Sequence, residues 1–75
     1  MCKYKLYEVD GGWDIKEGVL ISKHLTKKGV EKRAFKEACK RVKRVYYTVR
    51  TPLTPKITII DYGSYTRFLA IQEVK

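Results

Sequence analysis

The side chains with the clearest chemical potential in this sequence are lysines and arginines gathered in one segment. Residues 23–50 hold eleven basic and only two acidic side chains, whereas the rest of the 75-residue chain holds six of each. This segment therefore carries the entire formal net charge of +9. Positive charge concentrated on one element creates a directional field, which attracts a polyanion to one face of a protein.

The spacing in this segment predicts an amphipathic helix over residues 29–44, with Thr26 as its N-cap. A rotation of about 100° per residue places apolar side chains on one half of the helix and basic ones on the other, where only Glu37 interrupts them. Glu31 lies on the apolar side, in the first turn, where the helix dipole favours a carboxylate. The predicted apolar half consists of Val30, Ala34, Phe35, Ala38, Cys39, Val42, Val45 and Tyr46.

The basic half of this helix is a candidate surface for phosphate. Lys32, Lys36 and Lys40 follow one another at i, i+4 and i+8 with no acid in that row. Like charges at this spacing destabilise a helix, and an ordinary solvated face mixes the two signs. The pattern therefore favours a polyanionic partner over a merely solvated face. The predicted nucleic-acid contacts are Lys28, Lys32, Arg33, Lys36, Lys40, Arg41, Lys43, Arg44 and Arg50.

Three functions fit this surface, and we rank them in the following order. The first is a small non-enzymatic protein that contacts the phosphate backbone of DNA or RNA with little sequence specificity, because phosphate contacts position a protein without reading bases. The second is an interaction or inhibitor module, like the accessory proteins of mobile elements, whose basic face docks on an acidic protein that itself could bind nucleic acid. The third is a ribonuclease centred on His24, which lies beside Lys23, Lys27 and Lys28.

Other chemistry has weaker support. His24 has no second histidine or carboxylate at a catalytic spacing, and the chain holds no phosphate-loop, nucleophile-elbow or paired-cysteine motif. We therefore predict no enzymatic activity and no cofactor. Tyrosines near arginines, such as Tyr62 and Tyr65, fit half-buried sheet positions better than base-stacking platforms. The acids of the N-terminal segment match no metal-binding loop, so we predict no metal site at Glu8, Asp10, Asp14 and Glu17.

These side chains need a scaffold, which the sequence predicts to be a single α+β domain over residues 1–75. Residues 3–9 and 13–22 alternate as two strands of a hairpin, and Asp10-Gly11-Gly12 between them is a strong turn signal. Gly18 inside the second strand indicates a β-bulge.

Strand signals return after the helix. Residues 45–49 are β-branched and aromatic, which favours a strand. Residues 51–55 contain two prolines, which cannot donate to a ladder, and predict a loop. Residues 56–61 and 65–73 then form a second hairpin. The order ββαβββ corresponds to an antiparallel sheet of four or five strands with one amphipathic helix packed on one face.

The two C-terminal strands are apolar on both of their faces, as in residues 57–60 and 68–71. One helix covers one face of a sheet, so the other must be closed by a partner, by long side chains or by a second copy of the chain. A homodimer through the C-terminal hairpin is thus one expected state. Because the chain has no bilayer-length apolar run, no signal peptide and, with Cys2 and Cys39, no disulfide framework, we predict no membrane partner and a cytoplasmic location.

Overall fold

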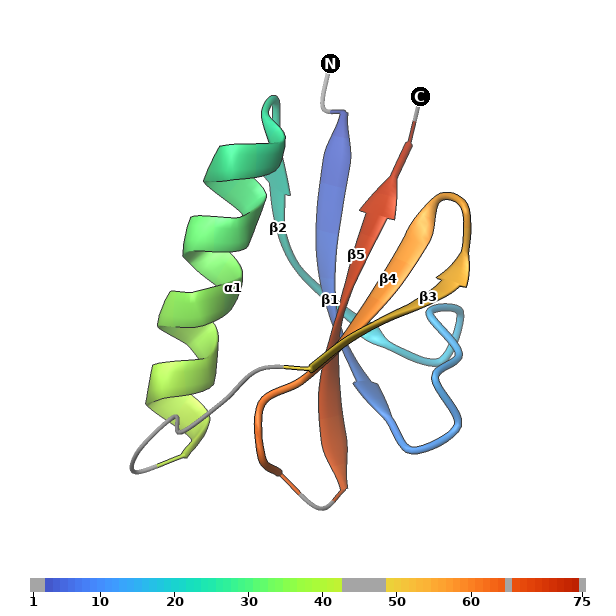
Figure 1. Ribbon diagram of the computed structural model, residues 1–75, viewed down its shortest axis with the longest axis vertical. Coiled ribbons are helices and arrows are strands. Elements are labelled where there is room, and N and C mark those ends of the chain that lie inside the picture. Colours follow the sequence, from blue (N-terminus) through green and yellow to red (C-terminus); the bar gives the residue numbers. More distant parts are fainter. Residues whose placement is uncertain (1–2, 43–48, 65, 75) are drawn as a thin grey trace.

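The computed structural model describes residues 3–42, 49–64 and 66–74. Its elements follow one another in the predicted order ββαβββ, which confirms the α+β class (Figure 1). The elements are β1 (Tyr4–Asp10), β2 (Val19–His24), α1 (Lys27–Arg41), β3 (Val49–Thr54), β4 (Ile57–Asp61) and β5 (Arg67–Glu73).

The strands form one antiparallel sheet with the spatial order β2-β1-β5-β4-β3. The last strand, β5, lies at the centre and pairs with β1 on one side and β4 on the other. Both predicted hairpins are confirmed, because β1 pairs with β2 and β4 pairs with β5. Within the described ranges no helix is long and apolar enough to cross a membrane.

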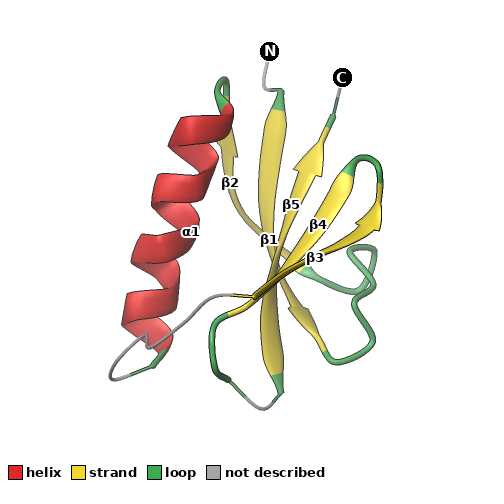
Figure 2. Cartoon of the chain, in the orientation of Figure 1, coloured by secondary structure: helices red, strands yellow, loops and turns green. Residues whose placement is uncertain are grey.

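The helix α1 covers one face of the sheet, as Figure 2 shows. It packs on β2, β1 and β5, and the β3–β4 hairpin extends past it. Burial of apolar surface between helix and sheet is the main favourable term in the stability of such a layer. The core on this face consists of Leu6, Val30, Ala34, Ala38, Ile60, Tyr62, Leu69 and Ile71.

The opposite face of the sheet is partly covered by side chains of the same chain. Val9, Ile59 and Ala70 are buried there, and Trp13 and Ile15 from the β1–β2 connection pack against them. The Trp13 ring meets the ring of Phe68 edge-on, with centroids 5.7 Å apart. The chain thus supplies part of the cover for this face itself, and the homodimer stays a prediction.

The β1–β2 connection differs from the prediction in two respects. The second strand begins at Val19 instead of residue 13, and Trp13 has a positive φ of 55° that no strand accommodates. The register shift lies opposite Leu6 and Tyr7, so the predicted bulge at Gly18 is wrong. Gly18 is instead a close-approach position, because a Cβ there would lie 2.8 Å from the carbonyl oxygen of Glu8.

The predicted loop at residues 51–55 is also wrong, because most of it belongs to β3. Pro52 lies within that strand and pairs with Thr58 of β4. The strand is at the edge of the sheet, where a proline is tolerated because one side of the strand has no partner to accept an N–H. Residues 45–48 of the strand predicted to follow the helix lie outside the described residues, and Val49 begins β3.

The helix itself is displaced from its predicted bounds of 29–44. Thr26 is the N-cap as predicted, and its hydroxyl accepts a hydrogen bond of 3.0 Å from the backbone N–H of Gly29. Because α1 begins at Lys27, Glu31 lies beyond the first turn, and the expected contact of its carboxylate with the helix dipole is wrong.

Candidate nucleic-acid interface

The helix is rotated about its axis relative to the predicted orientation. Val30, Ala34 and Ala38 face the sheet as expected, but they share that face with Glu37, which is only 6% exposed. Phe35 is 58% exposed and Cys39 is also exposed. The sequence placed Glu37 outside and the other two inside, so these three assignments are wrong.

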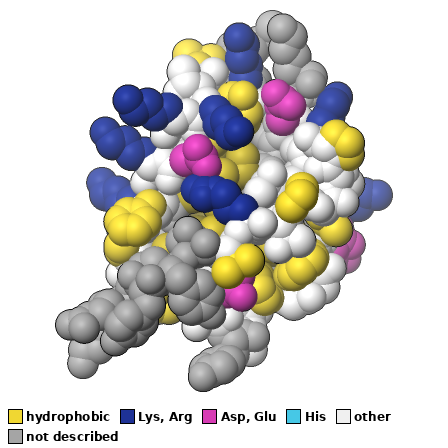
Figure 3. All heavy atoms as spheres, in the orientation of Figure 1, with side chains coloured by type: hydrophobic (Ala, Val, Ile, Leu, Met, Phe, Trp, Pro, Cys, Tyr) yellow, Lys and Arg dark blue, Asp and Glu magenta, His cyan; other side chains and the backbone are white. Residues whose placement is uncertain are grey.

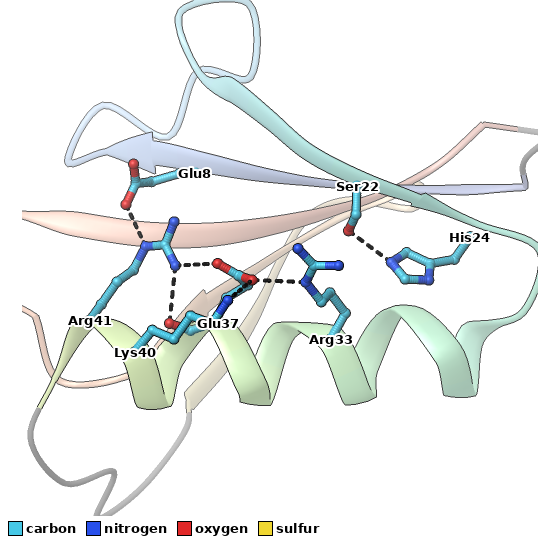
Figure 4. A network of polar contacts seen from close by, with 7 residues as sticks. All are labelled: Glu8, Ser22, His24, Arg33, Glu37, Lys40 and Arg41. Atoms are coloured by element: carbon cyan, nitrogen blue, oxygen red, sulfur yellow. Dashed lines mark hydrogen bonds and ion pairs between the residues drawn. The ribbon is translucent and has the colours of Figure 1, made fainter.

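A cluster of ion pairs accounts for the buried carboxylate of Glu37 (Figure 4). Arg33 Nε donates to Glu37 Oε2 at 2.8 Å, and Arg41 Nη1 donates to Glu37 Oε1 at 2.7 Å. The ammonium of Lys40 lies 3.5 Å from Oε2. Hydrogen bonds from Arg41, followed by those from Arg33, lower the pKa of Glu37 from its usual 4.5 to about 2. We call these residues, together with Glu8, the Glu37 cluster.

The Glu37 cluster also ties the helix to the sheet. Arg41 Nε donates to Glu8 Oε2 of β1 at 2.6 Å, and Arg41 Nη1 donates to the backbone carbonyl of Glu37 at 3.0 Å. One guanidinium thus joins two carboxylates and a carbonyl, which the fixed fork geometry of arginine allows. Glu8 lies 33 residues before Arg41, so the contact fixes the last turn of α1 against β1.

Arg50 makes the corresponding link on the other flank of the helix. Its Nη2 lies 2.8 Å from Glu31 Oε1, and its Nε donates to the same oxygen at 3.1 Å. Both side chains are partly exposed, so this pair contributes less to stability than the Glu37 cluster. It connects α1 to the edge strand β3, which the helix does not cover.

Four of the five lysines of α1 form a row on its exposed side. Lys28, Lys32, Lys36 and Lys40 are spaced at four-residue intervals and all are exposed; we call them the lysine row. The first three form no ion pair with any described acidic residue, and the side chain of Lys40 is 60% exposed despite its contact with Glu37. Dark-blue side chains accordingly line the edge of the molecule formed by α1 in Figure 3.

The structure therefore divides the nine predicted contact residues into three groups. Four form the lysine row, of which Lys40 also contacts Glu37, and Arg33, Arg41 and Arg50 are engaged with carboxylates of the protein itself. Lys43 and Arg44 lie outside the described residues. The sequence contained a signal for the engaged group, since Arg33, Glu37 and Arg41 alternate in sign at i, i+4 and i+8. It contained no comparable signal for Glu8.

The remaining candidate residues have local hydrogen-bonding roles. His24 Nε2 and Ser22 Oγ are 2.8 Å apart on β2. Asp10 and Asp14 each accept a backbone N–H two residues ahead, from Gly12 and Lys16, as aspartates commonly do in turns. Across the described ranges no group of three or more His, Cys, Asp or Glu side chains is arranged to hold a metal ion.

Comparisons with protein-family models, with curated proteins and with solved structures give no match for this chain. The candidate interface is therefore defined by its own geometry. It is a row of exposed lysines on the outer side of a helix, and the arginines of that helix hold its inner side to the sheet. Phe35, which the sequence placed in the core, is exposed beside this row.

Proposed function

We propose that this protein binds the phosphate backbone of nucleic acid through the lysine row, without catalysis and with little sequence specificity. The observation that carries the proposal is the separation of charges on α1. Every described acid of the helix is held by an arginine, while Lys28, Lys32 and Lys36 repel one another at i, i+4 spacing on the exposed side. Such repulsion destabilises the helix. An anion bound along the row would neutralise the charges and remove this cost.

The dimensions of the lysine row suit a polyanion. Twelve residues separate Lys28 from Lys40, which corresponds to about 18 Å along the axis of a helix. A duplex presents one phosphate charge per roughly 1.7 Å of its axis, so the row faces more phosphates than it has lysines. Four contacts predict that the logarithm of the duplex affinity falls against the logarithm of salt concentration with a slope of about −3.5.

The test is a pair of triple variants with equal charge. Lys28, Lys32 and Lys36 become glutamine in one variant, and Lys3, Lys16 and Lys23, which lie outside α1, become glutamine in the other. We expect the first variant to lose roughly two orders of magnitude in duplex affinity at 0.1 M salt and to flatten the salt slope to about −1. The second should bind almost as well as the wild type. Equal losses in the two variants would show that net charge alone drives binding, and would contradict the proposal.

A second candidate function has one specific observation in its favour. The ring of Phe35 is exposed beside the lysine row, and aromatic side chains are enriched in protein interfaces. On this alternative, an inhibitor or interaction module docks α1 on an acidic protein. An acidic protein that is captured stoichiometrically after nuclease treatment, and lost in the Phe35→Ala variant, would favour it. Unchanged duplex binding by the same variant would separate the two functions.

The proposal includes a cytoplasmic location and no membrane partner. Among the described residues of α1, the exposed apolar side chains are Phe35 and Cys39, a narrower apolar surface than that of a helix which lies in a membrane interface. Whether DNA or RNA is the natural ligand is decided by comparing 2′-hydroxyl and 2′-deoxy oligonucleotides of the same sequence. A phosphate-only interface predicts similar affinities for the two.

A further inference from the structure

The helix leaves part of its sheet face uncovered, and a pocket lies there. The pocket has a volume of about 190 Å³ and opens between the N-terminal half of α1 and strands β3, β4 and β5. Thr58 and Ile71, which pair across β4 and β5, form part of its floor. Lys27 and Glu31 line it from the helix, and Arg50 lines it from β3.

We infer that this pocket receives one unpaired nucleobase from a strand whose phosphates follow the lysine row. The inference rests on the proposed function and adds the class of ligand, which is a single strand or an unpaired nucleotide. The volume is below the roughly 300–1,000 Å³ of ordinary small-molecule sites. A pocket of this size suits one planar ring system with its substituents.

The lining is chemically mixed in a way that suits a base better than a phosphate. Lys27 and Lys56 supply donors, and Glu73 supplies a carboxylate acceptor. Glu31 adds its Oε2, since Arg50 engages its Oε1. These carboxylates offer no hydrogen-bond donor to a phosphate oxygen. They would instead accept hydrogen bonds from an exocyclic amino group, as Glu and Asp do with cytosine. The side chains of Tyr4 and Ile71 add apolar surface for the ring.

The position of the pocket connects it with the lysine row. Lys27 lines the pocket and precedes Lys28, the first member of the row, in the same turn of α1. A strand bound along the row therefore reaches the pocket at the N-terminal end of the helix. Bases inside a duplex are stacked and paired, and they cannot enter such a pocket without being flipped out. Access is thus restricted to unpaired nucleotides.

The test fills the pocket and leaves the lysine row intact. Thr58→Phe places a ring in the pocket, and Thr51→Phe is its matched control, because Thr51 pairs with Ile59 and faces the opposite side of the sheet. The probes are a ten-nucleotide deoxycytidine strand and a ten-base-pair duplex, measured by fluorescence anisotropy at one salt concentration. We expect Thr58→Phe to weaken single-strand binding by about fivefold or more, the effect of losing one stacked base. Its duplex affinity, and both affinities of the control variant, should not change.

The outcomes separate this inference from the proposed function. If Thr58→Phe weakens neither ligand, or weakens both equally while the lysine variants behave as expected, the pocket inference is wrong and phosphate binding stands. If the wild type binds neither ligand, both are wrong. A measurement on the unmodified protein guards against misfolding of the variant. The methyl resonances of Thr58 and Ile71 should shift on addition of the single strand and not of the duplex, and equal or absent shifts would overturn the inference.

Discussion

The inner and outer sides of α1 carry the same sign of charge and use it differently. Arg33 and Arg41 lie toward the sheet and hold the carboxylates of Glu37 and Glu8, whereas the lysine row lies on the exposed side. Arginine suits the inner position because its planar fork satisfies several oxygens at once, and lysine suits the outer one because its ammonium stays strongly hydrated. Only part of a basic segment is therefore available to a ligand, and the residue type indicates which part.

The inner side should respond most strongly to substitution. In the Glu37→Ala variant, the positive charges of Arg33 and Arg41 lose the buried carboxylate between them. Removing one partner of a buried pair costs at least about 3 kcal/mol where a buried charge is left behind, but both guanidinium groups here reach solvent and Arg41 keeps Glu8, so we expect a loss of about 2 kcal/mol. Urea unfolding monitored by Trp13 fluorescence measures the change.

The control for this prediction is Glu31→Ala, which removes the partner of Arg50 from an exposed pair. We expect that variant to lose less than about 1 kcal/mol. A Glu37→Ala variant as stable as the control would mean that the Glu37 cluster is no more than a surface ion pair. The distinction between the two sides of the helix would then have no energetic basis.

The pH dependence of stability sharpens the same comparison. The folded-state pKa of Glu37 is about 2, below its usual value of 4.5, so the unfolded chain binds this proton first. The contribution of the carboxylate is therefore complete above about pH 4.5 and is lost as the pH falls toward 2. Each proton taken up on unfolding changes stability by up to about 1.4 kcal/mol per pH unit.

The measurement compares unfolding free energies of the wild type and the Glu37→Gln variant between pH 6 and pH 2. Other carboxylates titrate in the same window, and the difference between the two proteins isolates Glu37. The wild type should lose its advantage over the variant as the solution is acidified. A constant difference across the window would show that the ionised state of Glu37 does not stabilise the fold.

The contact of Arg41 with Glu8 is expected to have an intermediate effect. In Glu8→Gln, the amide oxygen still accepts a hydrogen bond from Arg41, but the charge of the carboxylate is gone. Because both side chains of this pair are about one quarter exposed, we expect a loss of about 1 kcal/mol. Thermal unfolding at neutral pH measures it, and an unchanged midpoint would indicate that Arg41 is held by Glu37 alone.

The order of the elements and the hairpin pairing could be predicted from the sequence, because alternation, turn residues and helical spacing are local. The orientation of α1 about its own axis, which decides the residues that face the sheet, could not be predicted in this way. Placing Phe35 inside and Glu37 outside follows hydrophobicity, but burial of Glu37 depends on Arg41 and Glu8, and Glu8 is distant in sequence. A charged residue is buried where partners surround it, and partners supplied by another element are invisible in a helical projection.

Pro52 gives a second example of the same limit. Proline removes a backbone donor, so a segment that contains it predicts a loop unless the strand is known to lie at an edge of the sheet. Here β5 inserts between β1 and β4 and leaves β3 outermost. The edge position follows from the order of strands in space, which the order along the chain does not determine. The pocket between α1 and β3 depends on this arrangement and was equally unpredictable.

The smallest expected change in stability concerns the lysine row on the outer side of α1. It is an increase, whereas the preceding variants lose stability. In Lys32→Glu, two repulsive i, i+4 contacts, with Lys28 and Lys36, become attractive. Each such contact is worth about 0.2–0.5 kcal/mol and changes sign, so the variant should be more stable than the wild type by about 0.8 kcal/mol, the lower end of the summed change, while its duplex affinity falls by about tenfold or more. Lys32→Gln should gain about half as much stability, and Lys16→Glu, in the β1–β2 connection, should gain none. If Lys32→Glu were instead less stable, the repulsion along the lysine row would not be a cost that ligand binding relieves, and the main argument for a polyanionic partner would fail.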